Sequence, residues 1–148
     1  MPNYIKVSFS ALIGVTGAAI ADFFGGWDGN LIALIVLMCI DFFMGLLIAV
    51  FWGNSNKSEN GGLSSAACWK GVIKKLCTLL MVAVAVRADI LLGIDFARNA
   101  VIIAFCVSEI ISICENAALM GILPEGVKKV FDKIIDILKG EDKDGKDK

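Results

Sequence analysis

The chain has 148 residues, of which 57% are hydrophobic and 20% are charged, and its mean hydropathy is +0.78. A soluble domain is near half apolar with about a quarter charged residues, so this composition indicates a membrane protein. The 14 Lys and Arg residues nearly balance the 15 Asp and Glu residues, which excludes a broad electrostatic attraction to nucleic acid.

Histidine is absent from the sequence, which excludes hydrolase triads built on imidazole and removes the commonest zinc or iron ligand. The five cysteines are odd in number, form no CxxC motif and lie mostly in apolar runs, so we interpret them as packing residues. They are Cys39, Cys68, Cys77, Cys106 and Cys114. We therefore expect no catalytic residue, no metal site and no bound cofactor.

Long apolar segments dominate the first 121 residues. Each is close to the roughly 20 residues that a helix needs to cross a hydrocarbon core of about 30 Å. The four segments are residues 7–24, 31–52, 76–93 and 99–121. The sequence thus predicts an all-α integral membrane protein with four transmembrane helices in a domain over residues 1–121. We expect the first segment to be retained and not cleaved as a signal peptide.

Small residues recur at four-residue spacing along the first span and just beyond it. They form two stripes, which are Ser10, Gly14 and Ala18, and Gly17, Ala21 and Gly25. Such stripes let helix backbones approach closely in lipid. They predict either self-association of the chain or packing within one monomer.

Lysines accumulate before the first span, between the second and third spans, and after the fourth. They are Lys6, then Lys57, Lys70, Lys74 and Lys75, then Lys128, Lys129, Lys133 and Lys139. The two short connectors hold only Asp28 in one, and Asp95 with Arg98 in the other. Because basic residues favour the cytoplasmic side, both termini and the long loop are predicted to be cytoplasmic. Trp27, Trp52 and Trp69 fall near the predicted helix ends, where indole rings prefer the headgroup layer.

A further helix is predicted over residues 122–140, since Pro124 suits a first turn and Gly140 suits a helix end. Apolar residues recur there at three- and four-residue steps, with lysines and aspartates on the other face. This cytoplasmic amphipathic helix would lie in the membrane interface, pack on a partner helix or cap its own bundle. The charged tail, residues 141–148, is predicted to be disordered.

Every predicted span contains at least one carboxylate. These residues are Asp22, Asp41, Asp89 with the neighbouring Arg87, and Glu109 with Glu115. A charge at mid-membrane costs roughly 2.5–3.5 kcal/mol, so such groups must face a protein interior or a water-filled path, or be neutralised. They are therefore the candidate functional residues of the chain.

Depth along the helices suggests partners for these charges. Asp41 and Glu109 each lie ten residues into their spans, near the midplane, and Arg87 lies slightly farther out. We expect an ion pair between Arg87 and Asp41 or Glu109, with Asp89 as the local competitor.

The fourth span also presents a broad polar face. Ser108, Ser112 and Glu115 form one stripe, and Glu109, Ser112 and Asn116 form its neighbour. Two interpretations remain open, because polar groups in membranes either join helices or line an aqueous lumen.

Three segments, in order along residues 41–138, carry a resemblance to a known family. They are residues 41–49 (DFFMGLLIA), residues 63–65 (LSS) with 70–75 (KGVIKK), and residues 108–116 (SEIISICEN) followed by Gly121 and Pro124. They are similar to the small holins, of the holin-4 type, in the lysis cassettes of phages of Gram-positive bacteria and in clostridial toxin-release loci. Gly45, inside the first segment, is a further candidate for helix packing.

The resemblance implies a holin that self-associates in the bacterial cytoplasmic membrane and opens timed lesions, through which a cell-wall endolysin or a toxin leaves. No stable complex with that cargo is implied. A charge that moves through the membrane field gains roughly 2.3 kcal/mol per 100 mV, so Asp41 and Glu109 are hypothesised to couple opening to the proton-motive force.

Two other functions were weighed against this one. A small membrane lipid kinase needs converging groups that hold phosphate and Mg²⁺, and the cytoplasmic loop contains no arginine fork or acidic cluster. A small ion channel or transporter subunit is the second alternative, although neither broken helices nor inverted repeats are visible.

Overall fold

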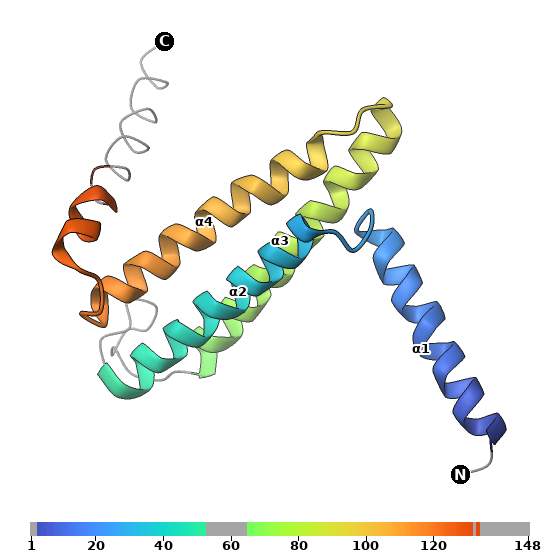
Figure 1. Ribbon diagram of the computed structural model, residues 1–148, viewed down its shortest axis with the longest axis horizontal. Helices are drawn as coiled ribbons and strands as arrows, with labels where there is room; N and C mark the ends of the chain where they lie inside the picture. Colours follow the sequence, from blue (N-terminus) through green and yellow to red (C-terminus); the bar gives the residue numbers. More distant parts are fainter. Residues whose placement is uncertain (1–2, 53–64, 132, 134–148) are drawn as a thin grey trace. The chain divides into compact units, whose positions relative to one another are not determined.

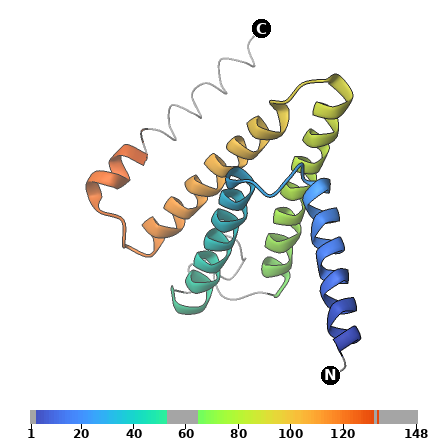
Figure 2. The same cartoon turned by 45° about the vertical axis from the view of Figure 1, so that its right-hand side comes forward.

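The computed structural model describes residues 3–52, 65–131 and 133. The regular elements are α1 (Asn3–Phe23), α2 (Gly29–Leu47), a π-helical turn (Ile48–Trp52), α3 (Ser65–Leu92) and α4 (Ala97–Leu119). Figures 1 and 2 show these helices from two sides, and the described residues contain no strand. The all-α prediction is confirmed.

The helices overlap the four predicted apolar segments, and in the described part of the chain three helices are long and apolar enough to cross a membrane. These are Asn3–Phe23, Gly29–Phe51 and Ala97–Leu119. Three of the four predicted spans are thus shown as candidates, and the fourth stays a prediction. The helix that does not qualify as a span is α3, which starts at Ser65, eleven residues before the predicted span.

Charge explains why α3 differs. Its 28 residues include Lys70, Lys74, Lys75, Arg87 and Asp89, and every stretch of eighteen residues contains at least three of them. Helical segments of this length span about 42 Å at 1.5 Å per residue, which exceeds the roughly 30 Å hydrocarbon core. The charges thus lie towards the two ends of a helix whose middle is apolar.

Glycines in the left-handed region end three of the helices. Gly25, Gly93 and Gly121 have φ values of 73°, 66° and 71°. The next residue in each case donates its amide to a carbonyl five residues back, and these bonds are Gly26 to Ala21 (2.7 Å), Ile94 to Asp89 (3.0 Å) and Ile122 to Ala117 (3.2 Å). This is the Schellman arrangement, which satisfies carbonyls left open at a helix end and favours glycine.

The chain divides into two compact units. The first unit comprises Met1–Val36 and Ile73–Cys106, and the second comprises Leu37–Val72 and Val107–Lys148. The first unit has an apolar core contributed by α2, α3 and α4. Its buried apolar residues are Leu31, Leu34, Val82, Ala83, Ala85, Val86 and Ile102.

The second unit buries fewer apolar side chains than the first, so polar residues make up a larger share of its buried positions. Met38, Ile48 and Ala117 are buried there together with Asp41 and Asn116. Ile48 opens the π-helical turn at the end of α2, a form of helix that is rare and often found near functional sites. The buried part of this unit is therefore partly polar.

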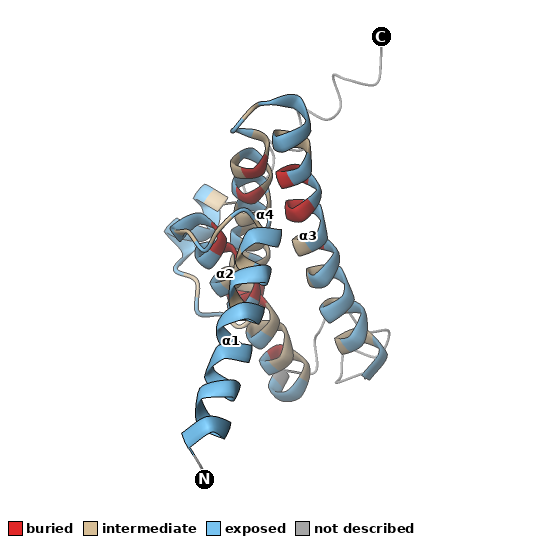
Figure 3. Cartoon of the chain, turned by 90° about the vertical axis from the view of Figure 1, so that its right-hand side faces the viewer, coloured by how far each residue is buried: buried red, intermediate tan, exposed pale blue. Residues whose placement is uncertain are grey.

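None of the residues described in α1 is buried. Figure 3 shows this helix in the colour of exposed residues over almost its whole length, whereas α2, α3 and α4 each show buried positions. Because α1 is apolar, its exposed surface suits lipid or another protein surface, not water.

A short helical stretch over residues 125–131 follows Pro124. The backbone carbonyl of Pro124 accepts a hydrogen bond from the amide of Lys128 at 3.0 Å. Residues 125–130 are all exposed. A helix is thus described within the predicted segment 122–140, from residue 125 on, while most of the second half of that segment and the tail, residues 141–148, lie outside the described residues. The same holds for most of the long loop, residues 53–64.

Candidate functional site

A buried carboxylate is the centre of the second unit. Asp41, on α2, is only 4% exposed. Its Oδ1 accepts hydrogen bonds from Ser112 Oγ at 2.6 Å and from Asn116 Nδ2 at 2.9 Å, and both donors lie on α4. Asn116 is itself buried, and its Nδ2 also lies 3.5 Å from the backbone carbonyl of Asp41. We call these three residues the Asp41 cluster.

Helix geometry explains why two donors reach one acceptor. Ser112 and Asn116 are four residues apart on α4, so their side chains lie one above the other on the same face. An ionised carboxylate only accepts hydrogen bonds, which matches a hydroxyl and an amide nitrogen. The cluster thereby satisfies polar groups whose burial without partners would cost several kcal/mol in a membrane interior.

The other candidates on α4 do not share this environment. Ser108 and Glu115 are exposed, and Glu109 is half-buried. The broad polar face predicted for this helix is therefore divided into a buried part, which holds Asp41, and a part at the surface. Asp22, the candidate on α1, is also exposed.

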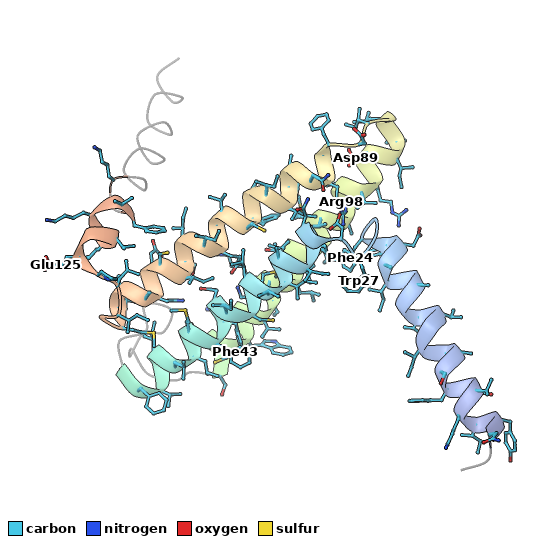
Figure 4. All side chains as sticks on the ribbon, in the orientation of Figure 1. Phe24, Trp27, Phe43, Asp89, Arg98 and Glu125 are labelled. Atoms are coloured by element: carbon cyan, nitrogen blue, oxygen red, sulfur yellow. The ribbon has the colours of Figure 1, made fainter. Side chains whose placement is uncertain are left out.

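A second polar network lies in the first unit and is centred on Arg98. This arginine is buried at the start of α4, and all three guanidinium nitrogens donate hydrogen bonds. Nε bonds the carbonyl of Phe24 at 2.7 Å, Nη2 bonds that of Gly26 at 3.1 Å, and Nη1 bonds Asp28 Oδ2 at 2.5 Å. Figure 4 shows Arg98 and Phe24 next to each other. We call this the Arg98 network.

Asp28 joins the network to α2. Its second carboxylate oxygen accepts the amide of Leu31 at 2.9 Å, as expected of a residue that caps the start of a helix. The hydrogen bond from Arg98 is the main cause that holds the pKa of Asp28 below its ordinary value, while partial burial opposes this shift. Asn30 and Asn99 add a contact of 3.5 Å between α2 and α4.

In the sequence, Asp28 and Arg98 served only as indicators of membrane topology. One signal pointed to their pairing, since the two short connectors were predicted on the same membrane side and contained opposite charges. Their contact follows from the path of the chain, which brings the α1–α2 turn to the first turn of α4.

Asp89 has a role that the sequence did not predict. Its two oxygens accept the backbone amides of Ala97 and Arg98, each at 2.9 Å, so the carboxylate caps α4. Arg87 instead lies over the ring of Phe23, with 5.9 Å between its Cζ and the ring centroid. Asp89 is thus engaged by two helix-end amides, and its competition for Arg87 stays a prediction. A pair of Arg87 with Asp41 or Glu109 stays a prediction.

The glycines and alanines predicted to pack helices fall into two groups. A Cβ added at Gly14 or Gly17 would meet no described atom within 4 Å, and Ala18 is exposed, whereas Ala21 and Gly45 are half-buried. A Cβ at Gly25 would lie 3.0 Å from Arg98 Nε. Only Gly25 is thus shown in close contact, and self-association through α1 stays a prediction.

No group of three or more His, Cys, Asp or Glu residues that could hold a metal ion occurs in the described part of the chain. The five cysteines are free thiols. The two polar networks are therefore the chemically distinctive features of the described residues.

Comparisons with known proteins connect these features to a family. Residues 18–139 match the model of the bacteriophage holin family. An uncharacterized protein of Listeria monocytogenes is 35% identical over 134 residues, which cover 89% of each chain. An uncharacterized protein of Halalkalibacterium halodurans is 36% identical over 134 residues, which cover 86% of this chain and 91% of the relative.

A further relative, an uncharacterized 14.9 kDa protein from the nagH 3′ region of Clostridium perfringens, is 32% identical over 135 residues. The match covers 89% of this chain and 93% of the relative. No solved structure matches the chain significantly. The family match includes both the Asp41 cluster and the Arg98 network.

Proposed function

The chain belongs to the bacteriophage holin family, and from this premise we propose that it is a holin that self-associates in the cytoplasmic membrane and opens lesions in it. The observation that carries the proposal is the Asp41 cluster, a polar group satisfied inside a segment apolar enough to span a membrane. The protein acts without catalysis in this proposal, through assembly alone.

The cluster fits a protein that must first hide polar surface and later expose it. While Ser112 and Asn116 bond Asp41, these groups are removed from lipid. If the helices separate within an oligomer, the same side chains can hydrogen-bond to water and line an aqueous lesion. This joins the two interpretations of the polar face, since its residues hold helices together at rest and face water after opening.

Assembly requires a surface for contact between copies. α1 offers one, because none of its described residues is buried, and Gly14 and Gly17 carry no side chain that would prevent a close approach. We propose that this helix contributes to the homo-oligomer.

We also propose that α3 forms a fourth crossing, which places both termini in the cytoplasm. Lysines at its start and at residues 128–133 would then lie on the cytoplasmic side. Its charges near the other end are accommodated, since Asp89 caps α4 and Arg87 lies over Phe23. The cargo released through the lesion is a cell-wall endolysin or a toxin.

Induced expression in a bacterial host tests the proposal. A holin stops growth abruptly and releases a cytoplasmic reporter enzyme when a cell-wall hydrolase is present. A selective channel passes ions, measured as a loss of membrane potential, but retains the reporter enzyme. Retention of the enzyme after the membrane has depolarised would refute the holin function and favour the channel.

The Asp41 cluster can be tested in the same assay. Simultaneous Asp41→Asn and Glu109→Gln replacement is expected to change the time of lysis if these groups respond to the membrane field. The control is Glu115→Gln, since Glu115 is exposed on the same helix. Unchanged timing in the double variant would refute the coupling to the proton-motive force.

A further inference from the structure

The attachment of α1 to the rest of the first unit is confined to one end of the helix. None of its described residues is buried, and a Cβ at Gly14 or Gly17 would meet no described atom. At its C-terminal end, by contrast, Phe23 lies under Arg87, and the carbonyls of Phe24 and Gly26 are bound by Arg98. The described contacts therefore hold α1 at its C-terminal end. We call the helix the α1 arm and this end its base.

Arg98 is the principal link at this base. A helix leaves its last carbonyls without partners, and here the arginine donates to two carbonyls of the turn that ends α1. Its third contact is the charge-assisted bond to Asp28, which caps α2. One buried side chain thus joins the end of α1, the start of α2 and the start of α4.

We propose that Arg98 is a latch that fixes the orientation of the α1 arm, and that its release frees α1 while the remaining helices of the unit stay packed. Arg98 acts here as a positioning residue. The part of the proposal that concerns lysis rests on the holin function proposed above.

The packing of the unit supports release without unfolding. The buried apolar residues come from α2, α3 and α4, and α1 contributes none of them. Leu34, Val82 and Ile102 are all fully buried in that core. Loss of the Arg98 contacts therefore removes constraints on α1 and leaves the apolar core unchanged.

Two adjacent glycines provide a matched test that keeps Arg98 in place. Gly25 and Gly26 both have positive φ, at 73° and 107°, so alanine is strained at either position. A Cβ at Gly25 would lie 3.0 Å from Arg98 Nε, 3.1 Å from Arg98 Cδ and 3.1 Å from a methyl group of Val86, whereas a Cβ at Gly26 would meet nothing within 4 Å. Gly25→Ala therefore disturbs the latch, and Gly26→Ala controls for strain in the turn.

The orientation of α1 can be measured directly in the full-length protein. Spin labels on Val15→Cys in α1 and Leu91→Cys in α3 would be placed in a chain whose five native cysteines are replaced by alanine. Both positions are exposed and belong to the first unit. The distance between the labels is then recorded by electron paramagnetic resonance in phosphatidylglycerol-containing vesicles.

The expected result is a distance distribution that is broader in Gly25→Ala than in Gly26→Ala, because only the alanine at position 25 also pushes against the Arg98 side chain. Equal broadening in both variants would assign the effect to turn strain, and no broadening in either would show that the contact does not hold α1; both results overturn the proposal. If Gly25→Ala does not fold by circular dichroism, Arg98→Lys decides in its place. Lysine keeps the charge but lacks the planar fork, so broadening supports the latch and an unchanged distribution overturns it.

The time of lysis separates this inference from the holin proposal. Gly25→Ala is expected to lyse an induced host earlier than Gly26→Ala, because α1 becomes free sooner. If the label distances broaden as expected but neither variant nor the parent protein lyses cells, the latch is supported and the holin function fails. If lysis occurs at equal times despite broadening, α1 release does not set the timing and that part is overturned.

Discussion

At the scale of single residues, two carboxylates show how burial changes the role of the same side chain. Asp41 is buried and accepts hydrogen bonds from Ser112 and Asn116, whereas the side chain of Asp28 is 45% exposed and pairs with Arg98. The hydrogen bonds of Asp41 satisfy polar groups that would otherwise face apolar surroundings. Asp28 instead joins helix ends from a turn, where water still reaches its carboxylate.

Removal of the Asp41 carboxylate should destabilise the protein. In Asp41→Leu, two hydrogen-bond donors on α4 lose their acceptor, at a cost of about 1–3 kcal/mol for each buried donor left unsatisfied. We expect a lower melting temperature in detergent, followed by circular dichroism. Asp22→Leu is the matched control, because Asp22 is exposed on α1. Equal melting temperatures for the two variants would contradict a stabilising role for the cluster.

The Asp28–Arg98 pair should show a defined pH dependence. The folded-state pKa of Asp28 is lowered, so its contribution to stability is fully present above the unfolded pKa of about 3.9 and is lost as the pH falls through the folded value. The difference in melting temperature between the parent protein and Asp28→Asn should therefore be constant from pH 5 to 7 and shrink below about pH 4. Asparagine retains the ability to cap α2, so a difference that grows in acid would contradict this assignment.

At the scale of the helices, the sequence predicted where the helices lie better than it predicted which side chains contact each other. Hydrophobic runs located the helices, and the helical residues of α2 with its π-helical turn, 29–52, lie close to the predicted 31–52. Residue counting also gives depth along a helix, but not the rotation that decides which neighbour a side chain meets. This is why Asp41, Ser112 and Asn116 were singled out without their mutual contact being foreseen, and why Asp89 was expected only as a competitor for Arg87 and not as a cap of α4.

The start of α4 illustrates a contact that no local pattern reveals. Asp89, at the end of α3, bonds the amides of Ala97 and Arg98 across a turn that includes Gly93 at positive φ. A cap taken from eight residues upstream does not resemble the usual cap beside the helix start. The signal available was a charged residue near the end of an apolar run, which was attributed to the membrane interior.

Loss of this cap should affect α4 locally. Asp89→Ala leaves two amides of the first turn without their acceptor, which costs about 0.5–2 kcal/mol as for other helix caps. We expect faster hydrogen exchange at the amides of Ala97 and Arg98, measured by nuclear magnetic resonance in detergent micelles. Asp95→Ala is the control, since Asp95 is exposed in the same turn and should leave both amides protected.

At the scale of the whole chain, the number of crossings depends on α3. Among the described residues, three helices qualify as spans by length and composition, and α3 is excluded by charges that lie towards its two ends. An even number of crossings puts the two ends of the chain on the same side, whereas an odd number separates them. Our proposal of an even number rests on the lysines, because Lys6 and residues 128–133 would otherwise face opposite sides.

Cysteine labelling from outside the cell distinguishes these topologies. In a chain without its native cysteines, Lys6→Cys and Lys128→Cys should react with a membrane-impermeant maleimide only after the protoplasts are permeabilised. Asp95→Cys, in the exposed turn between α3 and α4, should react in intact protoplasts and serves as the positive control. With α3 on the membrane surface, Lys128→Cys would instead react from outside while Lys6→Cys stayed protected. That pattern would leave three crossings, and the C-terminal basic helix could not then lie in the cytoplasm.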